Sequence, residues 1–280
     1  MNVKYVLLGL ARRYAAESLL FTIMKIRGEG SLGEHDPDGY LAEWQRWLGA
    51  RGLSLVDQHI LDVGSGRYAR FALRMLAAGA RRITLVDLYA MPLDAAEHQA
   101  LLRQDCAKLG LDLADVLARI NIVQGDFTLL PVPAAEDQVD LVISSTVLEH
   151  VRDPAQMLAR CCAWLKPGGA TCHFIDLRDH NLSFRYPFEM LTFSDQVWER
   201  WLDLQGGFHL NRWRAPDYIN AMHEAGFASI NYDASCIDHT GLKQILPRLD
   251  RRFQTVNRGM LAILSLYLYG EKLQPDKPVV

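Results

Sequence analysis

Five short apolar runs, separated by segments with a helical pattern, occupy the middle of this 280-residue chain. They are residues 59–64, 83–88, 120–125, 139–145 and 170–177. Strands that alternate with helices along a chain predict a parallel sheet. Because the runs are apolar at nearly every position, helices must cover both faces of that sheet. The sequence therefore predicts an α/β fold, a three-layer α/β/α sandwich.

The rest of the chain is expected to complete this sheet. Pro216 and Gly226 mark the two ends of a helix, a strand follows at 228–237, and a helical linker leads to a last strand at 260–270. Residues 177–215 are rich in aromatic residues, Arg and Asn, and they are too numerous for a simple connection. We therefore expect a mostly parallel seven-stranded sheet with an insertion after the fifth strand.

Charge and cysteine content narrow the class of protein. The chain has 30 basic and 33 acidic residues, without the clustered basic face that binds phosphates, which argues against a nucleic-acid partner. Its five cysteines include no CxxC pair, so neither a disulfide framework nor a thiolate zinc site is expected, as in a cytoplasmic protein. Arg12, Arg13, Glu17 and Lys25 interrupt the apolar N-terminal segment, which predicts an amphipathic helix and no membrane span.

A glycine-containing turn follows the first predicted strand. In the segment LDVGSGRYA, Gly64 and Gly66 let the backbone turn sharply and approach a ligand closely. Asp87 lies 23 positions after Gly64, at the end of the second predicted strand, where it could bind a ribose diol. GSGRYA also fits the dinucleotide pattern G-x-G-x-x-A, so this turn alone leaves open whether the cofactor is a nicotinamide dinucleotide or another nucleoside.

Three more elements follow in order: Gly125-Asp126-Phe127, the segment SSTVLEHV, and the turn LKPGG. With the glycine turn and Asp87, residues 59–176 resemble the class I S-adenosylmethionine-dependent methyltransferases, in the small-molecule branch of ubiquinone and sugar methyltransferases. The resemblance implies a Rossmann-like fold and S-adenosyl-L-methionine as cofactor. One departure is Tyr68, which stands where the family pattern has a third glycine.

The resemblance also assigns cofactor-binding residues. Asp62, Gly64, Ser65 and Gly66 would line the methionine portion, and Asp87 would accept both ribose hydroxyls. Asp126 would accept from the adenine amino group and Phe127 would pack on the adenine ring. The remaining members of the expected cofactor set are Leu88, Gly125 and Ser144. As the alternative, strand-end and turn aspartates also occur for local reasons, without any ligand.

Methyl transfer is an in-line displacement, so the enzyme must align the acceptor and, for a hydroxyl acceptor, remove its proton. His150 follows the fourth strand at the ligand-binding edge and matches a base in related sugar enzymes, although it could instead cap a helix or orient the cofactor. Asp176, at the end of the fifth strand, resembles the acid that partners this base. Asp179 and His180 could form a second acid/base pair or, with Asp176, a metal cluster, but such closely spaced loop residues are no ligand signature and no metal is expected.

The predicted insertion offers aromatic side chains and polar groups that could line an acceptor pocket. His180, Asn211 and Arg212 are the candidate substrate contacts. As the alternative, most of the aromatic residues would pack the insertion against the sheet.

The expected segments are a helical N-terminal cap (1–55), a cofactor-binding core (56–176), a substrate-covering insertion (177–215) and a completion of the sheet (216–280). We expect methyl transfer to a hydroxyl, amine or activated carbon of a small, sugar-like or natural-product-like acceptor. The chain could form a homodimer. The alternatives are an NAD(P)-dependent oxidoreductase and a non-catalytic nucleoside-binding module.

Overall fold

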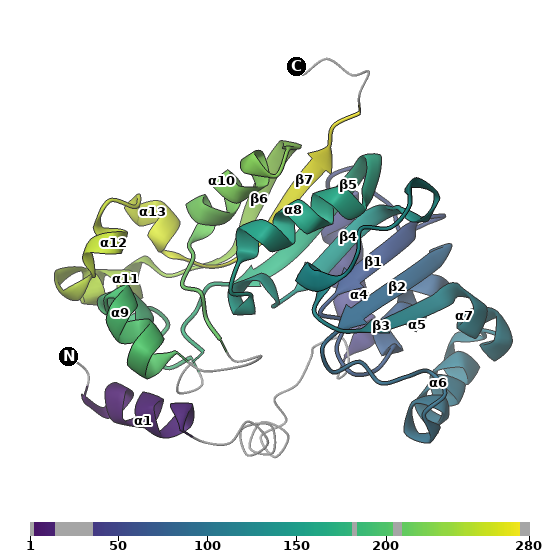
Figure 1. Cartoon of the computed structure of the whole chain (residues 1–280), viewed down its shortest axis with the longest axis horizontal. Helices are drawn as coiled ribbons and strands as arrows, with labels where there is room; N and C mark the ends of the chain where they lie inside the picture. The colour runs from purple at the N-terminus through teal and green to yellow at the C-terminus, as the bar shows by residue number, and fades with distance from the viewer. Residues whose placement is uncertain (1–2, 15–35, 181–183, 204–208, 275–280) are drawn as a thin grey trace.

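A computed structural model describes residues 3–14, 36–180, 184–203 and 209–274 of the chain. Within these residues, seven strands form one sheet in the order β3-β2-β1-β4-β5-β7-β6 (Figure 1). The strands are β1 (His59–Val63), β2 (Arg82–Asp87), β3 (Ile120–Gln124), β4 (Val139–Ser145), β5 (Leu165–Asp176), β6 (Phe227–Ile237) and β7 (Ile263–Lys272). β7 runs antiparallel to both of its neighbours, and the other paired strands are parallel. The expected mostly parallel, seven-stranded Rossmann-like sheet is confirmed.

Helices cover both faces of the sheet. One face packs against α4 (Pro37–Gly49), α5 (Arg70–Ala77) and α6 (Ala96–Leu109), with α7 (Leu113–Arg119) beside them. The other face packs against α8 (Pro154–Trp164) and α10 (Ala215–Glu224), which lie in front of the sheet in Figure 1. Alternate residues of β1 explain the two layers, because Ile60 belongs to the first core and Leu61 to the second.

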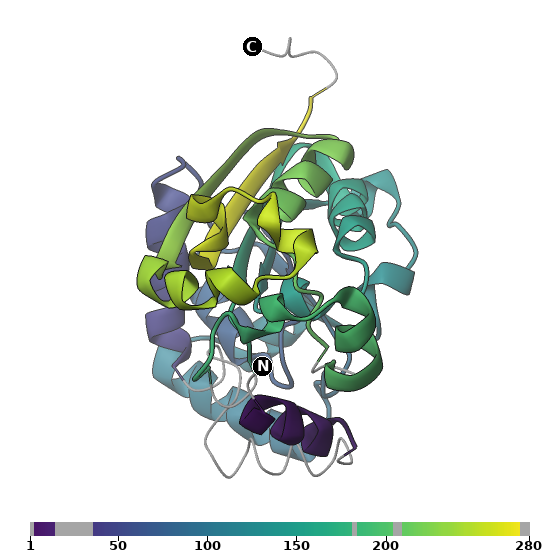
Figure 2. The ribbon, with the colours of Figure 1, turned by 90° about the vertical axis from the view of Figure 1, so that its left-hand side faces the viewer.

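A separate helical lobe lies at one end of the sheet (Figure 2). It contains α1 (Val3–Arg13), η4 (Glu189–Thr192), α9 (Asp195–Val197), η5 (Trp198–Leu202), α11 (His239–Ile245), η7 (Leu246–Arg248), α12 (Arg251–Gln254) and α13 (Arg258–Leu261). Tyr5, Phe188, Trp198 and Phe253 are buried together in its own core. The insertion after β5 therefore packs with the linker between β6 and β7.

The expected N-terminal cap is divided between these two parts. Trp44 and Trp47 of α4 pack on Tyr267 of β7, so this helix belongs to the sheet layers. Tyr5 of α1 belongs to the helical lobe, where its hydroxyl donates to Asp179. Residues 15–35, which include much of the predicted N-terminal amphipathic helix, lie outside the described ranges.

Several element boundaries differ from those that the sequence suggests. The last strand, expected at 260–270, begins at Ile263, because Arg258–Leu261 form α13. Pro92 is a residue type that favours the first turn of a helix, but α6 begins at Ala96, and side chains of His98 and Gln99 bind the carbonyls of residues 91–93. The turn at 166–169, expected to precede the fifth strand, belongs to β5, which begins at Leu165 and pairs irregularly with β4 there.

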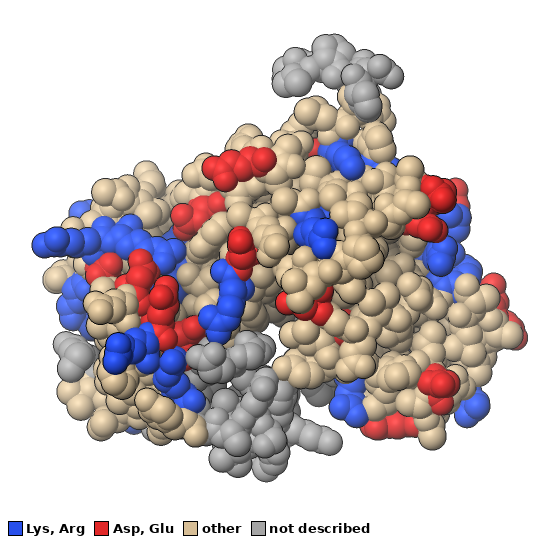
Figure 3. Space-filling view, in the orientation of Figure 1, with Lys and Arg blue, Asp and Glu red and all other residues tan. Residues whose placement is uncertain are grey.

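Charged side chains of both signs are interspersed on the face shown in Figure 3. None of the helices in the described ranges is long and apolar enough to cross a membrane.

Candidate active site

The glycine turn after β1 and the end of β2 are joined by hydrogen bonds. Gly64 and Gly66 have positive φ angles of 74° and 81°, which favour glycine. The Gly66 N–H donates to Asp87 Oδ2 over 3.0 Å, and the Tyr89 N–H donates to Asp87 Oδ1 over 2.7 Å. A Cβ atom at position 64 would meet Val147 Cγ2, so the turn is packed against the segment that follows β4.

Beside this turn, the described residues give Asp62 no cationic partner and Ser65 no hydrogen-bond partner. Asp62 is buried, and burial together with the charge of Asp87 raises the pKa of Asp62 to about 8. The Ser65 hydroxyl is buried and has no hydrogen-bond partner among the described residues. Buried polar groups normally have partners, so a ligand that brings a cation and a hydrogen-bonding group would satisfy both.

The predicted sugar and base contacts gather at the ends of β2 and β3. Leu88 is half exposed, and the Gly125 N–H donates to the Asp87 carbonyl over 3.0 Å. Asp126 is exposed, and its Oδ1 accepts from both the N–H and the hydroxyl of Thr128, capping η1 (Phe127–Leu129). The local turn role of Asp126 is therefore present, and it leaves the second carboxylate oxygen for a ligand.

The structure places Phe127 and Ser144 away from this surface. The Phe127 ring is buried against Trp164, with ring centroids 5.5 Å apart. Ser144 Oγ lies 2.7 Å from His173 Nδ1, and His173 Nε2 lies 2.7 Å from Thr171 Oγ1. Ser144 is in register with Val63, so its side chain lies on the face of the sheet opposite Asp62. Burial lowers the pKa of His173 in this network to about 3.

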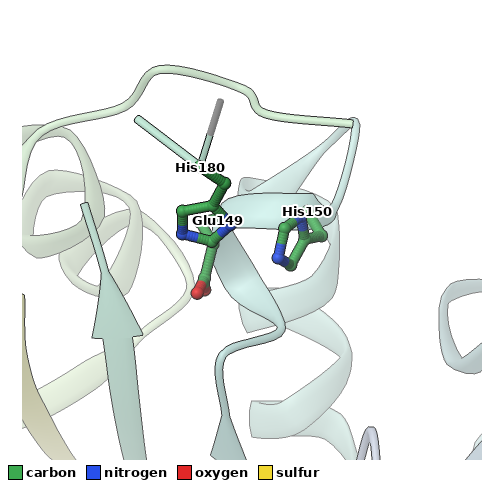
Figure 4. A group of neighbouring side chains, drawn as sticks. All are labelled: Glu149, His150 and His180. Atoms are coloured by element: carbon green, nitrogen blue, oxygen red, sulfur yellow. The ribbon is translucent and has the colours of Figure 1, made fainter. Parts of the chain in front are cut away.

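A second group of side chains lies at the carboxyl ends of β4 and β5 (Figure 4). Glu149 and His150 belong to η3 (Leu148–His150), Asp176 ends β5, and His180 follows it. The His150 and His180 ring centroids are 4.9 Å apart, and His180 Nε2 lies 3.7 Å from Asp176 Oδ2. Glu149 Oε1 accepts from the Asp176 N–H over 3.2 Å. The fold thus brings the predicted His150, Asp176 and His180 together and adds Glu149.

Burial sets the charge of this group. Burial, followed by the charge of His180, lowers the pKa of His150 to about 3. Burial, followed by the charge of Asp176, raises the pKa of Glu149 well above its usual range. Burial alone would raise the pKa of Asp176, but the hydrogen bonds from Arg178, together with the nearby His180, outweigh it and lower that pKa. Asp176 is therefore ionised and His150 neutral at physiological pH, and so low a pKa makes His150 a weak proton acceptor.

Asn211 is used within the protein, as a support for the turn that carries Glu149 and His150. Its Nδ2 donates to the carbonyls of Leu148 over 2.6 Å and Val151 over 2.9 Å, and its Oδ1 accepts from two further groups. Its own N–H donates to the Glu149 carbonyl over 3.0 Å. These contacts use the whole amide, so the structure gives Asn211 a positioning role.

Arg212 and Asp179 belong to the helical lobe. Arg212 donates to the carbonyls of Met190 and Phe193 and pairs with Asp195. Asp179 is fully buried and accepts from the Tyr5 hydroxyl and the Met190 N–H, so it does not join Asp176 and His180. Tertiary contacts alone explain both side chains.

Two residues were missed by the sequence analysis. His150 Nδ1 lies 2.7 Å from the carbonyl oxygen of His209, whose ring pairs with Asp203. No sequence signal marked His209, since it is 59 positions from His150. Glu149 could have been found, because it is adjacent to His150 in the segment SSTVLEHV.

The central part of the chain is similar to known proteins. Residues 61–172 match the family described as a methyltransferase domain. The ubiquinone biosynthesis O-methyltransferase of Coxiella burnetii (strain Dugway 5J108-111) is 30% identical over 117 residues, which cover 42% of this chain and 43% of that protein. The enzyme of that name from Bordetella pertussis is 32% identical over 127 residues, 44% of each chain. The chain spans under half the length of these curated relatives.

Solved structures share the fold. An S-adenosylmethionine dependent methyltransferase from Mesorhizobium loti aligns with 82% of this chain and 98% of its own, at 19% identity and a TM-score of 0.50. Haemonchus contortus phospholethanolamine N-methyltransferase 2, in complex with phosphomonomethylethanolamine and S-adenosylhomocysteine, aligns with 95% of this chain and 60% of its own, at 16% identity and a TM-score of 0.53. These likenesses concern the fold, and the expected resemblance is confirmed over the matched domain.

Proposed function

We propose, from the methyltransferase domain at residues 61–172, that this chain transfers a methyl group from S-adenosyl-L-methionine to a hydroxyl group of a small molecule. The observation that carries the proposal is the turn after β1. It joins Gly66 to Asp87, and among the described residues Asp62 has no cationic partner and Ser65 Oγ no hydrogen-bond partner. The names of the ubiquinone O-methyltransferases support oxygen as the methylated atom.

The residues at the turn suit the different parts of this cofactor. When bound, S-adenosyl-L-methionine supplies an electrophilic methyl group on a sulfonium. Asp62 would ionise beside the positive charge of the methionine portion, since its raised pKa reflects burial without a cation. Ser65 would give its hydroxyl to the same portion, and Asp87 would accept from the ribose hydroxyls. Asp126 would bind the adenine amino group with the oxygen that Thr128 leaves available.

The acceptor would lie beside Glu149, His150, Asp176 and His180. Val147 connects the two halves of the site, because it contacts Gly64 and directly precedes η3. The acceptor oxygen would form a bond to the methyl carbon as the carbon–sulfur bond breaks, and its proton would leave through this polar group to solvent. Residues 177–215 would exclude water from this end, as the sequence suggested.

Calorimetry with S-adenosylhomocysteine tests the cofactor half of the proposal. The wild-type chain should bind it and should not bind NADH. Asp87→Ala should raise the Kd at least about thirtyfold, because two hydrogen bonds are lost from a carboxylate. Asp137→Ala, at an exposed acid away from the turn, is the matched control and should bind normally. Equal affinities of Asp87→Ala and the control would contradict the assignment.

An assay of turnover tests the second part of the proposal, which is methyl transfer to a hydroxyl group. The chain should convert a phenol, sugar or other hydroxyl compound to its methyl ether with S-adenosyl-L-methionine, as detected by mass spectrometry. Cofactor binding without a methylated product across phenols, sugars and amines would favour a nucleoside-binding module instead.

A further inference from the structure

We propose that Glu149, His150 and His180 bind one divalent transition-metal ion, of the Zn²⁺ class, at the acceptor end of the site. The inference rests on the proposed function, since the ion would bind an acceptor oxygen there. The proposal departs from the expectation of no metal. In the structure Glu149 lies beside His180, whereas Asp179 binds Tyr5 elsewhere.

The three side chains converge from two separate segments. One ligand atom from each lies within 4.8 Å of the others (Figure 4). Zinc binds nitrogen and oxygen at about 2.0–2.2 Å, which places tetrahedral ligands roughly 3.4 Å apart. Small side-chain rotations would therefore bring these atoms to binding distance.

His150 is held as a metal-binding histidine usually is. Its Nδ1 lies 2.7 Å from the His209 carbonyl oxygen, and a carbonyl can only accept, so this nitrogen carries the hydrogen. Nε2 then has a free lone pair. Metal-binding histidines typically donate their other ring nitrogen to a carbonyl or carboxylate in this way, which fixes both tautomer and ring orientation.

Glu149 supplies an independent observation. Glu149 is 3% exposed, and its Oε2 has no hydrogen-bond partner among the described residues. Its Oε1 accepts from the Asp176 N–H. A buried carboxylate oxygen without a partner is costly, and a cation held between Glu149 and the two histidines would satisfy it.

The surrounding charges allow a cation here. The positive charge of Arg178 acts on Glu149, but Arg178 forms an ion pair with Asp176, so its charge is already balanced. The Glu149 carboxylate then balances part of the charge of the ion. Two imidazoles and one carboxylate suit Zn²⁺, Co²⁺ or Ni²⁺, whereas Mg²⁺ and Ca²⁺ prefer oxygen ligands throughout.

Three protein ligands would leave a coordination position for the acceptor. A bound ion lowers the pKa of a hydroxyl that it holds, so the acceptor would lose its proton to solvent without a strong protein base.

The test uses the full chain, stripped with a chelator and titrated with Co²⁺ as a visible-absorption probe and with Zn²⁺ by calorimetry. We expect one site per chain and visible bands of low-symmetry Co²⁺. Glu149→Gln and His180→Gln should each weaken Zn²⁺ binding by about a hundredfold or more, since each removes a ligand. His223→Gln, at an exposed histidine of α10, should bind Zn²⁺ like the wild type.

S-adenosylhomocysteine affinity, measured on the same samples, shows that the variants are folded and keeps the two proposals distinct. A wild-type chain that binds S-adenosylhomocysteine but gives no Co²⁺ bands would overturn the metal site alone. So would equal Zn²⁺ affinity in Glu149→Gln, His180→Gln and His223→Gln, or displacement of Co²⁺ by equimolar Mg²⁺. Loss of S-adenosylhomocysteine binding by the wild type would instead overturn the proposed function.

Discussion

Gly64 and Val147 are packed so closely that a Cβ atom at position 64 would lie 2.1 Å from Val147 Cγ2. The contact joins the turn after β1 to the segment that carries Glu149 and His150. The proposed cofactor and acceptor ends of the site are thus in direct packing contact. Position 64 requires glycine for both its positive φ angle and its small size.

Gly64→Ala should raise the Kd for S-adenosylhomocysteine at least about tenfold, because the added methyl must displace Val147 and alanine is strained at this positive φ. Gly64→Ala with Val147→Ala should recover part of the affinity in calorimetry, since the clash is removed and the strain remains. A double variant that binds no better than Gly64→Ala would count against the clash as the cause.

Asn211→Ala should destabilise the chain by about 2 kcal/mol or more, because it leaves the carbonyls of Leu148 and Val151 without their donor. Asn231→Ala removes an exposed asparagine that donates to Ser229, and it should change the free energy of unfolding little. Urea denaturation compares the two variants. Equal midpoints would show that Asn211 does not support the turn.

Arg214→Met should lower the free energy of unfolding by about 3 kcal/mol or more. Arg214 is fully buried and donates to the carbonyls of Leu177, Leu261 and Ile263, which methionine would leave unsatisfied. The control is Arg103→Met, at an exposed arginine of α6, whose effect should stay within about 0.5 kcal/mol. A small effect of Arg214→Met in urea denaturation would indicate that water replaces the guanidinium.

The buried His173 should make stability fall in acid. Its pKa in the folded chain is about 3, below the ordinary value of 6.5, so below pH 6.5 the unfolded chain takes up a proton that the folded chain does not. The free energy of unfolding should therefore be highest above pH 6.5 and fall below it, by at most about 1.4 kcal/mol per pH unit from this group.

Urea denaturation of wild type, His173→Gln and His223→Gln at about pH 7.5 and about pH 5 measures this contribution. His173→Gln should lose less stability between the two values than the wild type, whereas His223→Gln should behave like the wild type. Parallel pH dependence in all three chains would rule out His173 as a source.

Much of the architecture followed from local patterns. The apolar runs predicted the first five strands. The sequence pattern also predicted that the turn with Gly64 and Gly66 and the strand end at Asp87 serve one ligand, and the Gly66 N–H donates to Asp87. Such features are readable because strand burial and glycine turns depend on residues close in sequence. The expected homodimer and the ligand contacts themselves remain predictions.

The sequence by itself determined the layered sheet and the order of polar residues along its edge. Only the tertiary structure decided which side chains face the site: it turned Ser144 toward His173, engaged Asn211 and Arg212 in carbonyl contacts, and brought Glu149 beside His180. The physical reason is that hydrogen-bonding groups are satisfied by whichever partners folding brings near. Those partners come from positions too distant in sequence for any local pattern to reveal.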